Sequence, residues 1–167
     1  NRSYFLKDQD FKRLNLFSKL TFAISENSRL QFSVSSFGSS WNASGQIPNR
    51  AVSQGIINRF GSIDPNEGGT TQRTNYNLAY STKFGQTEFE VQAYAFSYRF
   101  KLFSNFTFFL EDSINGDMIE QDDNRFVKGL NTSYSIPHNF FGLDNKAIIG
   151  ASFRADDIEN QLWHAPD

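Results

Sequence analysis

The sequence predicts an all-β protein built as one antiparallel meander of about six strands. Six segments alternate apolar and polar residues, the period of a strand with two unlike faces, and residues 30–35 (Leu-Gln-Phe-Ser-Val-Ser) show it most clearly. Short turns and long polar loops join these segments in alternation. Aromatic residues make up 16% of the chain, with 19 Phe among them, and they favour strands over helices.

The first predicted hairpin has its strands at about residues 13–24 and 30–35. Their apolar side chains share a face: Leu14, Leu16, Leu20, Phe22 and Ile24, then Leu30, Phe32 and Val34. Residues 25–28, Ser-Glu-Asn-Ser, have the composition of a turn. A long polar segment is predicted to follow at residues 38–72.

Two further hairpins complete the pattern. Their strands are predicted at about residues 73–83 and 88–102, and at about 130–136 and 146–154, with turns at 84–86 and 137–145. A second long polar segment, residues 104–124, lies between them. Loops of this length are uncommon in compact domains and are usually functional.

The fourth strand changes phase along its length. Phe89, Val91, Ala93 and Ala95 occupy odd positions, whereas the later aromatic residues occupy even ones: Tyr94, Phe96, Tyr98 and Phe100. A β-bulge near Ala95 would return all of them to one face. Without a bulge, the strand carries an aromatic surface on the polar face of the sheet. Periodicity leaves both arrangements open.

A two-faced sheet with lopsided connections is typical of a membrane β-barrel. No segment approaches the roughly 18 to 20 apolar residues of a membrane helix. Backbone in lipid must satisfy its hydrogen bonds internally, and a sheet does so by closing on itself with alternate side chains facing outward. The side chains expected to face lipid are Leu14, Leu16, Leu20, Phe22, Leu30, Phe32, Val34, Leu78, Val91, Leu130 and Ile149.

Composition and motifs exclude several classes of function. A net charge of −2 lacks the basic excess of a nucleic-acid-binding protein, and the absence of Cys excludes disulfides and thiol chemistry. Neither His138 nor His164 has the spacing of a metal site or a catalytic triad, and both are expected to be exposed. No nucleophile elbow or phosphate-binding loop occurs. We expect no catalytic residue, no metal and no cofactor.

Acidic residues crowd the second long segment, and such oxygen-rich loops are able to hold calcium. The residues are Glu111, Asp112, Asp117, Glu120, Asp122 and Asp123. Their spacing fails the EF-hand pattern, so a solvated acidic loop is the preferred interpretation.

Charged residues of the first long segment are predicted to hold its shape. Arg50, Arg59 and Arg73 would pair there with Asp64 and Glu67. Glycines and two prolines fix local turns in the same segment.

Two motifs lie within this first segment. Residues 41–52 read W-N-A-S-G-Q-I-P-N-R-A-V, and residues 59–73 read R-F-G-S-I-D-P-N-E-G-G-T-T-Q-R. They resemble the early barrel region of TonB-dependent outer-membrane receptors of the Bacteroidetes type. Residues 10–19 resemble the strand that follows the plug domain in that family. The resemblance is strong over residues 10–82 and compatible from there to residue 167.

This resemblance implies that residues 1–167 are part of a barrel of about 22 strands closed by a plug. The complete receptor would bind a scarce solute, such as an iron chelate, a vitamin or a glycan. It would import that solute across the outer membrane of a Gram-negative bacterium with energy from the TonB complex. The implied partners are membrane lipid, the plug, the remaining strands, the TonB complex and the ligand.

The chain is expected to be an internal piece of a longer protein. It begins at Asn1 without a signal-peptide pattern, and neither a plug nor a TonB-contacting segment is apparent. The isolated piece is expected to self-associate, because its apolar face and two open edges would be exposed.

Aromatic residues near the loops are the candidates for ligand contact. They are Trp41, Phe60, Tyr98 and Phe100, with Phe103 and Phe106 nearby. Interfacial girdles and loop packing explain these residues equally well. No specific solute follows from them.

A soluble alternative remains open at this point. A secreted β-sandwich that binds carbohydrate would show the same alternation with its apolar face turned inward. Periodicity does not distinguish inside from outside, so the loop asymmetry and the motifs alone favour the membrane.

Overall fold

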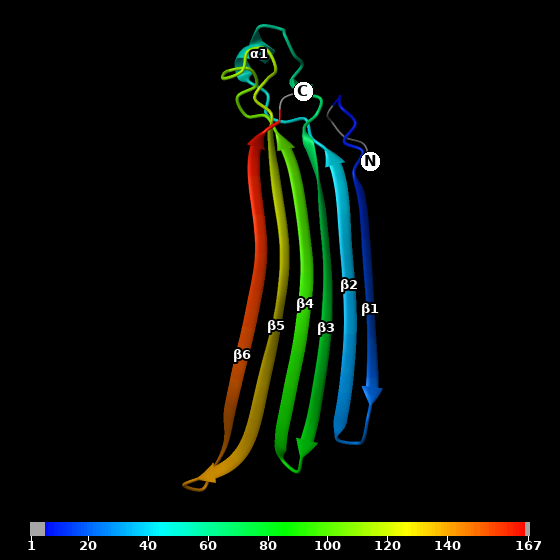
Figure 1. The fold of residues 1–167 in the computed structure, drawn as a ribbon, viewed down its shortest axis with the longest axis vertical. Helices are drawn as coiled ribbons and strands as arrows, with labels where there is room; N and C mark the ends of the chain where they lie inside the picture. The colour runs from blue at the N-terminus through cyan, green and yellow to red at the C-terminus, as the bar shows by residue number, and fades with distance from the viewer. Residues whose placement is uncertain (1–5, 166–167) are drawn as a thin grey trace.

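The computed structural model describes residues 6–165. Its elements, in chain order, are β1 (Lys12–Ala23), β2 (Ser28–Asn42), α1 (Asn49–Ser53), β3 (Gly68–Phe84), β4 (Thr87–Ser104), β5 (Ile119–Phe140) and β6 (Leu143–His164). The six strands form one antiparallel sheet in the order of the chain (Figure 1). The predicted all-β meander of three hairpins is confirmed.

Short turns lie at one end of the sheet and long connections at the other (Figure 1). The turns span residues 24–27, 85–86 and 141–142, and the long connections span residues 43–67 and 105–118. Gly85 and Gly142 have φ angles of 62° and 77°, which a two-residue hairpin turn requires and glycine adopts without strain. The lopsided connections predicted from the sequence are therefore present.

The strands are longer than alternation predicted, and both long segments are shorter. β2 runs on to Asn42 and β3 begins at Gly68, so the first connection starts after residue 42 and not at residue 38. Ser39 pairs with Thr71 and Ser40 with Thr70. Because small polar residues occupy both faces here, the sequence shows no alternation of apolar and polar residues. The backbones nevertheless pair in the same antiparallel register as the rest of β2 and β3.

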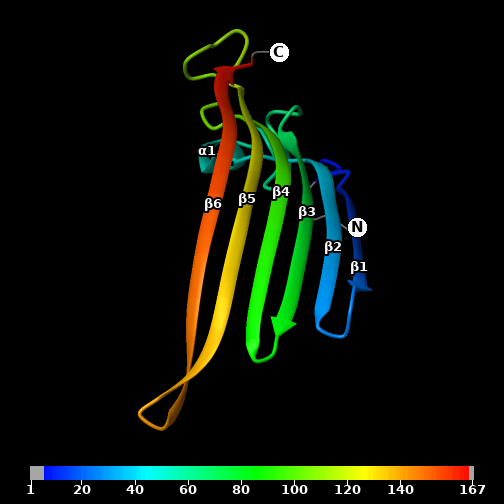
Figure 2. The ribbon, with the colours of Figure 1, turned by 60° about the horizontal axis from the view of Figure 1, so that its bottom comes forward.

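The turn predicted at residues 137–145 is also wrong. β5 continues through Pro137, which pairs with Lys146, and the chain reverses only at residues 141–142. Proline is tolerated here because β5 pairs with β4 only as far as Ser135, so this part of β5 is an edge. The β5–β6 hairpin consequently projects beyond the other two turns (Figures 1 and 2).

No bulge interrupts β4. Ala95 pairs with Tyr76 on one side and with Lys128 on the other, and the register continues residue by residue past it. The bulge considered near Ala95 is therefore absent. Tyr94, Phe96, Tyr98 and Phe100 share a face with polar residues such as Asn131 and Gln92. The strand has an aromatic surface on the polar side of the sheet.

The register places all residues predicted to face lipid on one side of the sheet. One row across the six strands shows the rule: Phe22, Leu30, Tyr80, Val91, Thr132 and Ala151. Most of the large apolar side chains on this face are exposed; Leu16 is 59% exposed and Ile149 is 66% exposed. We call this side the apolar face.

The described residues form no hydrophobic core. The buried hydrophobic residues among them are Ala51, Met118 and Val127, and the first two lie in the long connections. A soluble β-sandwich buries such a face against a second sheet. No second layer covers the apolar face within residues 6–165, so the sandwich alternative is not favoured. No helix in this part of the chain is long and apolar enough to cross a membrane.

Two glycines in the strands provide a test of this packing. A Cβ at Gly129 would collide with the Tyr94 ring and lie 2.7 Å from Phe153 O, whereas a Cβ at Gly38 would lie 3.9 Å from Thr71 O. Gly129→Ala should therefore lower the free energy of unfolding by about 1–3 kcal/mol, the usual cost of overpacking. Gly38→Ala should be tolerated.

The measurement is urea unfolding followed by Trp fluorescence. Equal stability of Gly129→Ala and Gly38→Ala would contradict the register of β4, β5 and β6.

Candidate functional site

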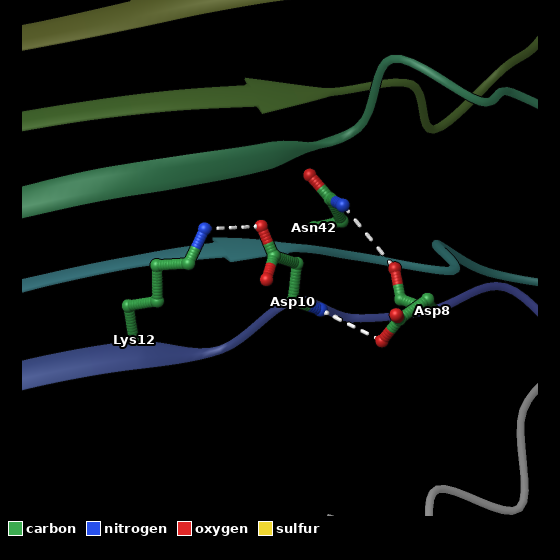
Figure 3. A network of polar contacts seen from close by, with 4 residues as sticks. All are labelled: Asp8, Asp10, Lys12 and Asn42. Atoms are coloured by element: carbon green, nitrogen blue, oxygen red, sulfur yellow. Dashed lines mark hydrogen bonds and ion pairs between the residues drawn. The ribbon is translucent and has the colours of Figure 1, made fainter.

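The two long connections lie at the end of the sheet where β1 begins (Figure 1). The segment before β1 is tied to the end of β2, where Asn42 N–H donates to Gln9 O at 2.8 Å and Asn42 Nδ2 donates to Asp8 O at 3.2 Å. Asp10 N–H donates to Asp8 Oδ1, and Lys12 Nζ contacts Asp10 Oδ2 at 2.7 Å (Figure 3). This end of the sheet is the candidate functional site.

Lys7 joins the entering segment to the first long connection. Its Nζ donates to three carbonyl oxygens, Ala43 O at 2.9 Å, Pro65 O at 2.6 Å and Glu67 O at 3.2 Å. Ala43 N–H in turn donates to Glu67 O at 2.8 Å, which closes the connection at its base. One ammonium group therefore fixes both ends of residues 43–67.

Glu67 and Asn105 join the two long connections to each other. Asn105 N–H donates to Glu67 Oε1 at 2.8 Å, and Asn105 Nδ2 donates to Asp64 Oδ2 at 2.8 Å. The side-chain oxygen of Asn105 accepts from Phe108 N–H at 2.7 Å. Glu67 and Asn105 are both buried, so these bonds are shielded from water. We call Lys7, Asp64, Glu67 and Asn105 the polar hub.

Burial sets the electrostatics of the polar hub. It raises the pKa of the Glu67 carboxyl, an effect that the hydrogen bond from Asn105 opposes. It lowers the pKa of Lys7, against the attraction of Glu67 and Asp64. Glycine is required at residue 45, which has a φ of 65° and whose Cβ would collide with the Glu67 carboxylate. The hub is thus a packed structural element.

The arginine pairing predicted for this loop is wrong. None of the ion pairs within residues 6–165 involves Arg50, Arg59 or Arg73. Glu67 and Asp64 bond instead to Asn105, which lies 38 and 41 positions away in the sequence. Local spacing favoured the arginines, but tertiary pairing of the loops brought other donors closer.

The second long connection holds its own shape. The Asp117 carboxylate accepts hydrogen bonds from Leu110 N–H at 2.8 Å, Glu111 N–H at 3.1 Å and Asp112 N–H at 2.7 Å. These donors lower the pKa of Asp117 to about 2, with the bond from Asp112 as the largest cause. Asp112 accepts in the same way from Ile114 N–H and Asn115 N–H.

The acidic residues do not assemble a metal site. No group of three or more His, Asp or Glu side chains within the described residues is arranged to hold an ion. The Asp112 and Asp117 oxygens accept from backbone donors, and Glu120 and Asp122 contact Lys101. His138 and His164 are exposed. His164 Nε2 is also hydrogen-bonded to Gly116 O at 2.8 Å.

The ligand candidates Tyr98 and Phe100 lie together on the polar face. Their rings stack with centroids 6.5 Å apart and planes 5° from parallel. Beside them, the Arg73 guanidinium lies 4.3 Å from the centre of the Phe96 ring, a cation–π contact. This aromatic row, Tyr94 to Phe100, is one of the two arrangements that the phase change in β4 left open, and the unbroken register of β4 produces it.

The other candidates are not part of this row. Trp41 lies at the end of β2 and packs its ring against Gly69 of β3. Phe60 lies in the first long connection and is 44% exposed. Phe103 is on the apolar face, and Phe106 lies in the second connection. The structure therefore brings together Tyr98 and Phe100 alone among the four main candidates.

Sequence reasoning missed Lys7, Asn105 and the contact of Arg73 with Phe96. Lys7 lies before the first strand, and Asn105 stands directly after the last residue of β4. Neither residue belongs to a local sequence pattern from which its hydrogen-bond partner could be predicted. One signal of such a contact was present in the sequence: Glu67 lies in a loop just after Pro65, and its carboxylate would need a hydrogen-bond donor if it were buried.

Comparison with known proteins supports the fold class. No family model matches the sequence. No curated protein matches it. Among solved structures, the fold is similar to part of a large outer-membrane β-barrel, in agreement with the resemblance to TonB-dependent receptors at the level of the fold.

That structure is the ferric citrate transporter FecA in its unliganded form, with a TM-score of 0.77 and 13% sequence identity. The match covers 96% of this chain and 23% of the FecA chain, so this chain spans about a quarter of the transporter's length. At this identity the similarity establishes the fold alone.

Removing the Asn105 side chain should loosen both long connections together. Asn105→Ala deletes the bonds to Asp64 and Phe108, and a buried group left without its partner costs about 1–3 kcal/mol. Limited proteolysis of the full-length protein should cut residues 43–67 and 105–118 faster. Asn115→Ala, which alters an exposed residue, is the matched control and should change the second connection alone.

The fold of the second connection should depend on pH through Asp117. Its folded-state pKa of about 2 lies below the ordinary 3.8, so its stabilising contribution is complete above about pH 4 and is lost as the pH falls toward 2. Hydrogen exchange should show protection factors at Leu110, Glu111 and Asp112 that decrease over this range. The Asp117→Asn variant should lack this step; a step of unchanged size would contradict the assignment.

Proposed function

We propose that this chain is a section of the barrel of a TonB-dependent receptor in the outer membrane of a Gram-negative bacterium. The loop motifs of residues 41–52 and 59–73 favour the Bacteroidetes type. The complete protein binds a scarce solute at the loop end and imports it with energy from the TonB complex. We assign it no catalytic step.

The exposed apolar face is the observation that carries this proposal. Six long strands satisfy their backbone hydrogen bonds side by side, while Leu14, Leu16, Phe22 and Ile149 have no second layer against them. A monomeric soluble protein rarely leaves so extended an apolar surface in water. Such a face is stable in hydrocarbon, because the hydrogen bonds between paired strands leave few backbone N–H and C=O groups without a partner.

On the apolar face, the boundary between apolar and polar residues runs obliquely across the strands. This supports strands that are tilted in the membrane. One register row runs through Leu14, Gly38, Gln72, Arg99, Asn124 and Glu159, from apolar in β1 to charged in β6. In a barrel whose strands tilt by about 35–45°, paired residues lie at different depths. If one end of a row lies in hydrocarbon and the other at the headgroup level, its residues should change from apolar to charged along the row.

The opposite face suits a water-filled or plug-filled interior. Hydrogen bonds link polar side chains across strands there, Gln92 Nε2 to Asn77 Oδ1 at 2.7 Å and Asn131 Nδ2 to Gln92 Oε1 at 3.3 Å. The aromatic row lies on this same face, closer to the long connections. Tyr98 and Phe100 are therefore our proposed contacts for the solute or for the plug.

A labelling experiment in cells tests the orientation. Ile114 is 85% exposed in the second long connection, and Phe141 is 90% exposed in the last short turn. In the full-length protein, a membrane-impermeant maleimide should label Ile114→Cys on intact cells, and Phe141→Cys only after the outer membrane is permeabilised. Recovery of the protein in the soluble fraction, or labelling of both sites on intact cells, would refute the proposal. Loss of solute uptake after TonB is deleted tests the transport step.

A pair of arginine substitutions tests which face meets lipid. Leu16 and Asn15 are adjacent in β1 and point to opposite faces. In the full-length protein, Leu16→Arg should cost about 2–4 kcal/mol of folding free energy if residue 16 lies near the bilayer midplane, and Asn15→Arg much less. Equilibrium unfolding from lipid vesicles measures both. Equal costs would contradict the face assignment.

A further inference from the structure

A groove of about 650 Å³ lies on the apolar face, in the part of the sheet near the long connections. The side chains from this face that line it include Leu14, Leu16, Gly38, Gln72, Arg99, Lys101 and Asp122. These residues come from five neighbouring strands, β1 to β5, and occupy adjacent register rows. The remaining lining residues are their neighbours along the strands.

Gly38 forms the floor of the groove, and the backbone does not require a glycine there. Its φ is not in the left-handed region, and an added Cβ would meet nothing closer than Thr71 O at 3.9 Å. No bulge occurs, since Gly38 pairs with Leu14 and with Gln72 in unbroken register. Glycine weakens a strand interior, and in the absence of a bulge it often marks a place where a ligand or another backbone approaches the sheet closely.

The two walls of the groove differ in chemistry. Leu14 and Leu16, 63% and 59% exposed, form the wall on β1. Arg99 of β4 stands opposite, with no carboxylate in ion-pair contact anywhere in residues 6–165. Its neighbour Lys101 is already engaged, because it contacts both Glu120 and Asp122. The groove thus offers an apolar wall and one unpaired guanidinium.

We propose that this groove binds a phosphate-bearing lipid of the membrane leaflet on the side of the long connections. The inference rests on the proposed function, because it requires the apolar face to lie in a bilayer. The acyl chain packs along Leu14 and Leu16, and the headgroup phosphate accepts hydrogen bonds from Arg99. Guanidinium groups suit phosphate because their planar fork donates two parallel bonds.

The position of the groove favours a lipid over a soluble anion. It lies where the face changes from apolar to polar, the depth at which a phospholipid carries its phosphate. A soluble phosphate would gain nothing from the Leu14 and Leu16 wall, and a lipid without phosphate would gain nothing from Arg99. The combination of both walls selects an amphiphile that carries phosphate.

The test uses the full-length protein in a neutral detergent, titrated with lipid A and followed by native mass spectrometry. Arg99→Ala should weaken binding about fivefold, the usual effect of one cation near an anionic lipid surface. Gly38→Leu should block binding by filling the groove. Arg29→Ala is the matched control, since Arg29 is exposed on the opposite face near the short turns, and it should leave affinity unchanged. Arg99 makes no ion pair within the described residues, so its variant should fold even if Gly38→Leu does not.

Other results would overturn the inference. These are unchanged affinity in Arg99→Ala, equal binding of phosphate-free diacylglycerol, or displacement of lipid A by inorganic phosphate at equal concentration. If the protein fractionates with the outer membrane but shows one of these results, the lipid site fails and the proposed function stands. If the protein is recovered as a soluble species, both fail.

Discussion

The whole structure depends on backbone hydrogen bonding between neighbouring strands. Residues 6–165 contain no packed core, so the backbone hydrogen bonds between successive strands, from β1 through to β6, hold the sheet together. Each ladder satisfies donors and acceptors that would otherwise need water. That frees one face of the sheet to be apolar and the other to be polar, and the proposed membrane role follows from this division.

The loop end is organised by a different interaction, the burial of a few charged and amide groups with their partners. Lys7, Glu67 and Asn105 connect three segments that are far apart in sequence. Asp117 organises residues 110–112 through hydrogen bonds made within the second connection itself. Loops that carry their own hydrogen bonds keep a defined shape above the sheet, as recognition of a solute would require.

The two faces also explain why similar residues have different roles. Arg73 lies on the polar face and covers Phe96, whereas Arg99 lies on the apolar face beside the groove. Likewise, Phe22 is exposed on the apolar face, while Phe96 belongs to the aromatic row. Residue type alone does not separate these roles; the position in the register does.

The sequence by itself determined the number of strands, their order and, apart from the second half of β4, the two faces, because a period of two is a local property that each strand carries independently. It also indicated the loop asymmetry and the family resemblance. Tertiary structure alone decided the unbroken register at Ala95, the extension of β5 through Pro137, and the partners of Glu67. These features depend on which strand lies alongside and on which hydrogen-bond donor, distant in sequence, lies close to a carboxylate. The residue pattern of a single strand does not specify its neighbours.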